Sequence, residues 1–153
     1  MNKIILIKHW KGAPGLRYFG LGPFFTPCRG LNKLKIFLND NTSWAKDREI
    51  NDLKHCLSNS DVIVSLWQGT KILGFGRALS DGIYRAVLWD IVIDENHQGN
   101  GYGKLIVSSI LKSKKMKRIE KIYCMTSNKK EFYSQMNFEE VISQSLLMID
   151  HLN

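Results

Sequence analysis

A short glycine-rich segment is the part of the chain best suited to bind a ligand through its main chain. Residues 98–104 read Gln-Gly-Asn-Gly-Tyr-Gly-Lys, with glycine at every second position, between an apolar stretch and a helix-like one. Glycine allows unusual backbone torsions and lets a ligand approach the main chain closely. The free N–H groups and the dipole at the start of a helix favour a phosphate or pyrophosphate. The segment therefore predicts an anion site made of backbone groups.

Two other phosphate-binding motifs do not fit this segment. The dinucleotide-binding fingerprint requires GxGxxG and an acidic residue about 20 positions later, whereas here the spacing is GxGxG and Glu120 follows a lysine-rich stretch. A P-loop requires GxxxxGK and then Ser or Thr, which residues 99–105 lack. A flexible turn without a ligand is the alternative to an anion site.

The glycine segment fits the pattern Gln/Arg-x-x-Gly-x-Gly/Ala and resembles the acetyl-CoA signature of the GCN5-related N-acetyltransferases (GNAT). Residues 128–138, Asn-Lys-Lys-Glu-Phe-Tyr-Ser-Gln-Met-Asn-Phe, resemble a second signature of that family, Asn-x-x-x-Phe-Tyr-x-x-x-Gly-Phe. Asn137 replaces the usual glycine, and Asn tolerates a left-handed backbone better than most residues. Residues 80–82 and 89–94 add a narrower likeness to the cyanobacterial and plastid branch, which includes the plant-type serotonin N-acetyltransferases.

The resemblance implies acetyl transfer from acetyl-CoA to a primary amine by direct attack in a ternary complex, with no metal. Backbone groups of Ile91, Val92 and Ile93 would bind the pantetheine arm as a strand does and supply the oxyanion donor. Asn128 would hydrogen-bond the pantetheine or phosphate end. The residues expected to hold the pyrophosphate are Gln98, Gly99, Asn100, Gly101, Tyr102, Gly103 and Lys104.

Tyr133 matches the position of the general acid in the second signature. A phenol with a pKa of about 10 stays protonated at neutral pH and can donate to a departing thiolate. The alternative is a tyrosine that simply packs in the core beside Phe132.

Asp90 is the candidate general base, because the resemblance points to it and because partial burial is expected to raise its pKa. A structural carboxylate at a strand bulge is the alternative, and Asp81 or His97 could act as base instead. Asp81, Asp90 and Asp94 are further expected to make the acceptor mouth locally acidic.

The acceptor amine is not specified by any motif. The chain has enough aromatic residues to line a pocket for an arylalkylamine such as serotonin or tryptamine, whereas a protein lysine or a polyamine are alternatives. A non-catalytic acyl-CoA-binding or nucleic-acid-associated module is the alternative from another class. The aromatic candidates are Trp10, Tyr18, Phe19, Phe24, Phe25, Phe37, Trp44, Trp67 and Trp89.

The chain of 153 residues has 22 Lys and Arg against 14 Asp and Glu, a net charge of +8. The excess concentrates in residues 104–121, and a solvated helix end explains such a stretch as well as a phosphate-binding surface does. Nucleic acid is disfavoured because the chain has no RNP motif, no set of zinc ligands and no regular alternation of basic and aromatic residues. Part of the positive charge is expected to bind the phosphates of acetyl-CoA.

The pattern of apolar residues predicts an α/β fold with a mixed sheet and a strand–glycine loop–helix unit at its centre. The resemblance implies that this sheet is GNAT-like, mostly antiparallel and flanked by helices, and that the unit binds acetyl-CoA. Residues 1–30 are expected to form an extended N-terminal arm, and residues 31–153 a single domain. Strands are expected at residues 3–7, 31–38, 62–68, 72–79, 83–93, 121–125 and 141–149, and helices at 43–58, 104–115 and 128–136.

The three cysteines, Cys28, Cys56 and Cys124, form no CxxC pair and are expected to be reduced thiols. No signal peptide or membrane-spanning stretch is expected, which favours the cytoplasm, or the plastid stroma if the chain is plastid-encoded. The family resemblance is compatible with a homodimer.

Overall fold

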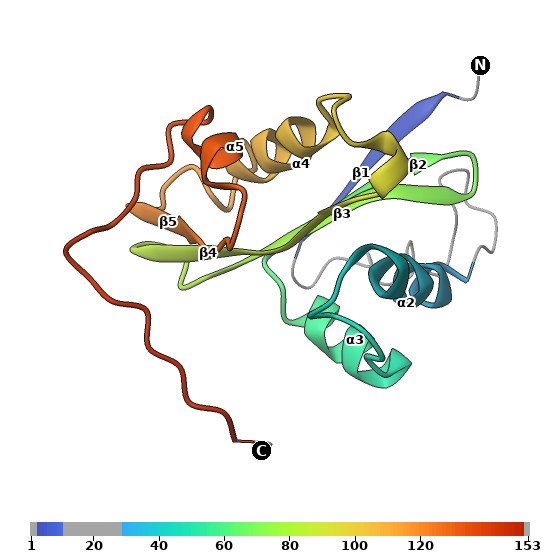
Figure 1. Ribbon diagram of the computed structural model, residues 1–153, viewed down its shortest axis with the longest axis horizontal. Coiled ribbons are helices and arrows are strands. Elements are labelled where there is room, and N and C mark those ends of the chain that lie inside the picture. The colour runs from blue at the N-terminus through green and yellow to red at the C-terminus, as the bar shows by residue number, and fades with distance from the viewer. Residues whose placement is uncertain (1–2, 11–28, 152–153) are drawn as a thin grey trace.

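The computed structural model describes residues 3–10 and 29–151, which form one five-stranded sheet with helices on both faces (Figure 1). In spatial order the strands are β1 (Ile4–Trp10), β2 (Val62–Gln68), β3 (Lys71–Ser80), β4 (Arg85–Ile93) and β5 (Lys121–Cys124). The helices are α2 (Gly30–Asn41), α3 (Ile50–Ser58), the 3₁₀ turn η1 (Glu95–His97), α4 (Tyr102–Leu111) and α5 (Lys130–Ser134).

The sheet is mixed and mostly antiparallel, as predicted. Strands β1 to β4 pair antiparallel in sequence order, and β4 pairs with β5 in parallel. The parallel pair is the strand–loop–helix–strand unit that carries the glycine segment, because α4 crosses over from the end of β4 to the start of β5.

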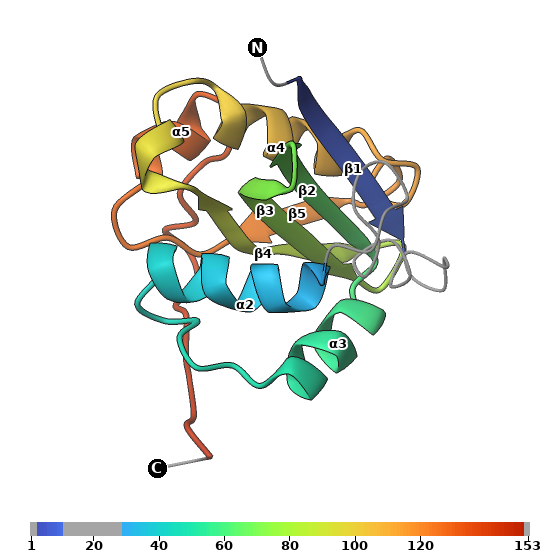
Figure 2. The same cartoon turned by 90° about the vertical axis from the view of Figure 1, so that its right-hand side faces the viewer.

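Helices α2 and α3 cover one face of the sheet, and α4 and α5 cover the other (Figure 2). Two glycines of β3 permit α4 to pack closely on its face of the sheet. A Cβ on Gly74 or Gly76 would come within 2.6 or 2.7 Å of the Ile106 side chain on α4. The two glycines therefore let α4 lie directly against the sheet.

The strand predicted for residues 31–38 is wrong, because this segment is part of helix α2. The alternation of Leu34, Ile36 and Leu38 suggested a strand, but Ile36 is exposed and Phe37 is buried. Leu34, Phe37 and Leu38 follow the i, i+3, i+4 spacing of a helix face, and all three pack in the core against the sheet.

Other predicted elements also differ from the structure. The strand predicted for residues 141–149 is wrong, because residues 142–144 form a turn and the segment has no strand partner in the described part of the chain. Of the helix predicted for 43–58, only α3 forms. The strand predicted for 3–7 is part of the longer β1. The rest of the predicted arm, residues 11–28, lies outside the described residues.

Candidate functional site

One edge of β4 is open over its second half. On the β3 side, β4 is paired as far as Ile93, whereas on the β5 side pairing ends at Leu88 opposite Cys124. Within the described chain, the main chain of residues 89–93 therefore has no strand partner on the β5 side. Ile91, Val92 and Ile93, the residues predicted to bind an extended ligand, lie on this open edge. Their N–H and C=O groups can pair with a ligand as they would with a strand.

A β-bulge lies at the start of the open edge. Two residues of β4, Asp90 and Ile91, lie where β3 supplies only Gly76. Asp90 has a positive φ of 51°, a backbone conformation that Asp and Asn adopt more readily than most residues. A bulge increases the local bend and twist of its strand, which turns the following residues away from β5.

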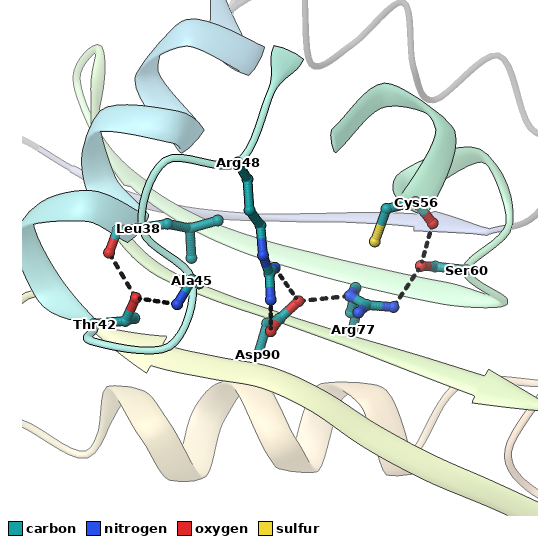
Figure 3. Close-up of polar contacts among 8 residues, drawn as sticks. All are labelled: Leu38, Thr42, Ala45, Arg48, Cys56, Ser60, Arg77 and Asp90. Atoms are coloured by element: carbon teal, nitrogen blue, oxygen red, sulfur yellow. Dashed lines mark hydrogen bonds and ion pairs between the residues drawn. The ribbon is translucent and has the colours of Figure 1, made fainter. Parts of the chain in front are cut away.

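The Asp90 carboxylate lies between two arginines (Figure 3). Arg77 Nε on β3 donates to Oδ2 at 2.7 Å, and Arg48 donates to Oδ2 from Nη1 at 3.0 Å and to Oδ1 from Nη2 at 3.3 Å. Arg77 also donates to Ser60 Oγ, which in turn donates to the Cys56 carbonyl at the end of α3. These contacts connect the bulge of β4 to β3, to the segment between α2 and α3, and to α3 itself.

These pairs reverse the expected pKa of Asp90. Burial alone would raise it, but the hydrogen bonds and charges of Arg48 and Arg77 outweigh burial and hold the pKa below its usual value. The prediction of a raised pKa is therefore wrong. Sequence reasoning missed both arginines, because they lie 42 and 13 positions from Asp90 and belong to no motif.

The residue that follows β4 anchors the glycine segment. The Asp94 carboxylate accepts a hydrogen bond from the Asn96 N–H and contacts His97 Nδ1 at 2.8 Å and Lys71 Nζ at 2.7 Å. Burial alone would raise the pKa of Asp94, but Lys71, His97 and the Asn96 N–H lower it to about 2. Asp94 therefore fixes the turn η1, from which the glycine loop begins.

The glycine loop, residues 98–104, shows its main chain to solvent. Gly99 and Gly101 have φ of 80° and 77°, and a Cβ on either would meet no protein atom within 4 Å. Gly101 is the N-cap of α4, and no side chain caps that helix. The first N–H groups of α4 are thus left for a ligand. Gly103 differs, since a Cβ there would come within 3.0 Å of the Phe132 ring on α5.

The polar residues predicted to assist the glycine loop come from the loop itself and from the connection between β5 and α5. Gln98, Asn100 and Lys104 are exposed on the loop, and the Asn100 amide donates to the His97 carbonyl at 3.1 Å. Asn128 is exposed in the connection between β5 and α5. Tyr102, at the start of α4, packs partly buried against the core.

Tyr133 is buried on α5, in the same hydrophobic cluster as Ile91 and Ile93 of the open edge. Its ring meets Phe132 and Phe138 edge to face, at centroid distances of 5.0 and 5.6 Å. Burial, with a smaller contribution from Cys124, raises the pKa of Tyr133 to about 12. Its phenol is therefore protonated at neutral pH.

Asn137 lies three residues after the end of α5 and has a φ of 64°. The predicted left-handed conformation is thus confirmed. The Phe138 N–H then bonds back to the Tyr133 carbonyl at 3.2 Å and closes the end of α5.

The acidic mouth is not formed as predicted, whereas the aromatic pocket stays a prediction, because most of its residues lie outside the described part of the chain. Asp81 accepts three backbone hydrogen bonds in the β3–β4 turn, at the opposite end of β4 from the glycine loop, and both Asp90 and Asp94 are paired with cations. Phe37 and Trp67 are core residues. Trp44 is exposed. The Trp10 side chain and Tyr18, Phe19, Phe24 and Phe25 lie outside the described residues.

Among the described residues, no group of three or more His, Cys, Asp or Glu side chains could hold a metal ion. None of the described helices is long and apolar enough to cross a membrane.

The open edge of β4, the glycine loop and α4 fall within a recognised family domain. Residues 58–140 match the acetyltransferase (GNAT) domain family. The chain belongs to the GNAT family. A relative from Gracilaria tenuistipitata var. liui, named uncharacterized N-acetyltransferase ycf52, is 31% identical over 142 residues, which are 90% of this chain and 76% of that protein.

Other GNAT relatives match over a smaller part of their length. The protein of the same name from Pyropia yezoensis is 33% identical over 106 residues, 66% of this chain and 60% of that protein. The chain thus spans little more than half the length of some curated relatives that it matches. The crystal structure of a putative GNAT acetyltransferase from Xanthomonas campestris shares the fold, with a TM-score of 0.72 and 18% identity over 99% of this chain and 97% of that one.

Proposed function

We propose that this GNAT chain transfers an acetyl group from acetyl-CoA to a primary amine by direct attack in a ternary complex. The observation that carries the proposal is the continuity of the open edge of β4 with the glycine loop and the uncapped start of α4. An extended arm that ends in a pyrophosphate needs these two features in this order, and acetyl-CoA has that shape.

The residues present fit this co-substrate. Ile91, Val92 and Ile93 would pair with the amides of the pantetheine arm, and the main chain of residues 98–104 would hold the pyrophosphate. Positive φ at Gly99 and Gly101, with free space where a Cβ would stand, supports close contact with phosphate oxygens. Lys104 adds a positive charge, and Asn128 is assigned to the pantetheine or phosphate end.

Acetyl transfer then needs three groups. The neutral amine nitrogen attacks the thioester carbonyl carbon, and a backbone N–H at the open edge of β4 stabilises the oxyanion. When the C–S bond breaks, the Tyr133 phenol donates its proton to the thiolate. The raised pKa keeps this phenol protonated at neutral pH, although it also makes the phenol a weaker acid. The proton lost by the ammonium, whose pKa is about 10, goes to a base directly or through water.

Asp90 as that base stays a prediction, and its surroundings favour the alternative role of holding the bulge. Its carboxylate already accepts hydrogen bonds from two guanidinium groups, which lower the pKa and weaken it as a base. Asp90→Asn separates the two roles. If Asp90 is the base, the variant loses kcat at unchanged stability. If Asp90 holds the bulge, the variant loses stability first.

For the acceptor, an arylalkylamine such as serotonin or tryptamine is the proposed substrate, with protein lysine and polyamines as alternatives. The described aromatic residues give this choice little support, because Phe37 and Trp67 are in the core. Release of CoA should therefore be measured with tryptamine, serotonin, spermidine and a lysine peptide side by side. Absence of turnover with every amine, in a folded protein that binds acetyl-CoA, would favour a non-catalytic acyl-CoA-binding module.

Tyr133→Phe tests the enzyme proposal. Loss of a general acid lowers kcat by about 10²-fold or more, while the affinity for acetyl-CoA should stay within about twofold because the site's backbone groups are unchanged. Tyr123→Phe on β5 is the matched control and should keep the wild-type rate. A Tyr133→Phe variant with full kcat would contradict the assignment of Tyr133.

A further inference from the structure

A basic surface, residues 112–121, lies at the far end of α4 from the glycine loop (Figure 1). Here the chain forms a series of turns that connect α4 to β5. Helix α4 has 10 residues, so about 15 Å separate its two ends. The basic surface is therefore separate from the proposed site for the acetyl-CoA pyrophosphate. Its exposed cations are Lys112, Lys114, Lys115, Lys117, Arg118 and Lys121.

The positive charge of this surface is not balanced by nearby acids. None of its lysines, nor Arg118, forms an ion pair with another described residue. Glu120 is the one acid within residues 112–121, and its carboxylate already accepts a hydrogen bond from Arg85 Nη1 at 3.3 Å. The surface therefore attracts a ligand that carries several negative charges.

The turns that carry the cations are anchored to the core. Met116 is 2% exposed, and Ile119 packs against the hydrophobic cluster under α4. The N–H groups of Met116 and Lys117 both bond to the Ser113 carbonyl, at 3.0 and 3.2 Å. The backbone that carries the cations is thus ordered before a ligand arrives, which lowers the entropic cost of binding.

An exposed aromatic ring lies beside the basic surface. The Lys121 N–H donates to the Tyr84 carbonyl at 3.0 Å, so the β3–β4 turn lies against the basic segment. The Tyr84 side chain is 59% exposed. An aromatic ring next to a row of cations is a platform on which an unpaired base can stack.

We propose that this surface binds single-stranded nucleic acid, with the cations on the backbone phosphates and the Tyr84 ring on an unpaired base. The missing RNP motif and zinc ligands argue against modules that read bases, whereas binding to phosphates requires only positive charges. An acidic peptide has no base to stack on Tyr84. A membrane-binding surface needs an apolar face, and Ile83 is the one exposed large aliphatic residue within residues 83–85 and 112–121.

Fluorescence anisotropy of a labelled oligouridine, titrated with the full chain in the absence of acetyl-CoA, tests the proposal independently of the enzyme function. Each phosphate contact of a single strand contributes about −0.7 to the slope of log K against log salt. Removing three lysine charges should make the slope shallower by about 2 and weaken binding about 100-fold at about 0.1 M salt. A wild type that does not bind, or an unchanged variant, would overturn the proposal. The variant combines Lys114→Gln, Lys115→Gln and Lys117→Gln.

A matched triple variant removes the same charge from exposed lysines elsewhere on the molecule. Because salt screens charges that lie more than about 10 Å away, this control should bind oligouridine within about threefold of the wild type. Equal losses in the two triple variants would show that net charge, and not this surface, holds the strand, which contradicts the proposal. The control combines Lys8→Gln, Lys46→Gln and Lys54→Gln.

Substitutions of Tyr84 test the class of partner. Tyr84→Ala should weaken oligouridine binding about tenfold, because one stacked base is lost, whereas Tyr84→Phe keeps the ring and should bind as the wild type does. Unchanged affinity in Tyr84→Ala would exclude the stacking contact and overturn the proposal. Equally tight binding of polyglutamate, or of phosphatidylglycerol vesicles at the same concentration of charge, would point to another class of partner and also overturn it.

Competition with acetyl-CoA tests the location of the site. Saturating acetyl-CoA should leave the oligouridine bound, because the glycine loop and the basic surface lie at opposite ends of α4. Displacement of the oligouridine by acetyl-CoA would show that the strand occupies the pyrophosphate site, and the proposal of a second site would then be wrong.

Discussion

The two regions along the end of β4 are built in opposite ways. The glycine loop is made of main chain from seven consecutive residues, 98–104, and is mostly exposed. The Asp90 cluster, defined as Arg48, Ser60, Arg77 and Asp90, is made of side chains from four separate segments and is largely buried. The loop leaves hydrogen-bonding groups free for a ligand, whereas the cluster uses its groups within the protein.

The two regions therefore contribute to different properties of the protein, one to stability and the other to ligand affinity. Buried charges are costly unless paired, so the Asp90 cluster contributes chiefly to holding the bulge and the α2–α3 segment in place. The glycine loop has few contacts to lose and contributes chiefly to ligand affinity. Substitutions in one region should therefore change stability, and substitutions in the other should change acetyl-CoA binding.

The largest effect is expected from Asp90→Asn. The substitution keeps the shape and the tolerance for positive φ but leaves the buried Arg77 without a counter-charge, at a cost of about 2–3 kcal/mol in the free energy of unfolding, since Arg48 is partly exposed. Urea unfolding followed by circular dichroism measures it. Asp47→Asn, an exposed Asp that also has positive φ, is the matched control and should change stability by less than about 0.5 kcal/mol.

Gly101→Asn should have the next largest effect, on affinity. Asn accepts the left-handed backbone, but its side chain occupies the space next to the start of α4, so we expect the Kd for acetyl-CoA to rise about tenfold, or about 1.4 kcal/mol. Gly82→Asn makes the same change at positive φ in the β3–β4 turn and should bind acetyl-CoA as the wild type does. Equal losses of affinity in both variants would show that the loop has no special role.

The smallest effect is a pH dependence at the junction of the two regions. The folded pKa of Asp94, about 2, lies below its unfolded value, so its stabilisation is present above about pH 4 and is lost as the pH falls from there towards 2. Asp94→Asn, which keeps the N-cap, should cost about 1 kcal/mol at pH 7, because Lys71 is half exposed, and almost nothing near pH 2. A cost that is the same at both pH values would contradict this account of Asp94.

The same two regions show how far the sequence predicts the structure. The glycine loop could be predicted because its residues are consecutive and glycine reports a backbone requirement directly. The Asp90 cluster could not, because its partners come together only through the β3–β4 register and the α2–α3 connection, which no local pattern encodes. The strand prediction for residues 31–38 was wrong for a related reason. Leu34, Ile36 and Leu38 alternate by coincidence, and only the packing of Phe37 shows the helix.

The separation of stability from acetyl-CoA affinity between the two regions is tested most directly by calorimetry. Acetyl-CoA is titrated into Asp90→Asn and Gly101→Asn, and an unfolding curve is measured for each variant. We predict that Gly101→Asn loses about tenfold in affinity with little change in stability, and that Asp90→Asn loses stability while its Kd, measured on the folded protein, stays within about twofold of the wild type. The reverse pattern, with affinity lost in Asp90→Asn and kept in Gly101→Asn, would contradict the proposal that acetyl-CoA binds to the glycine loop.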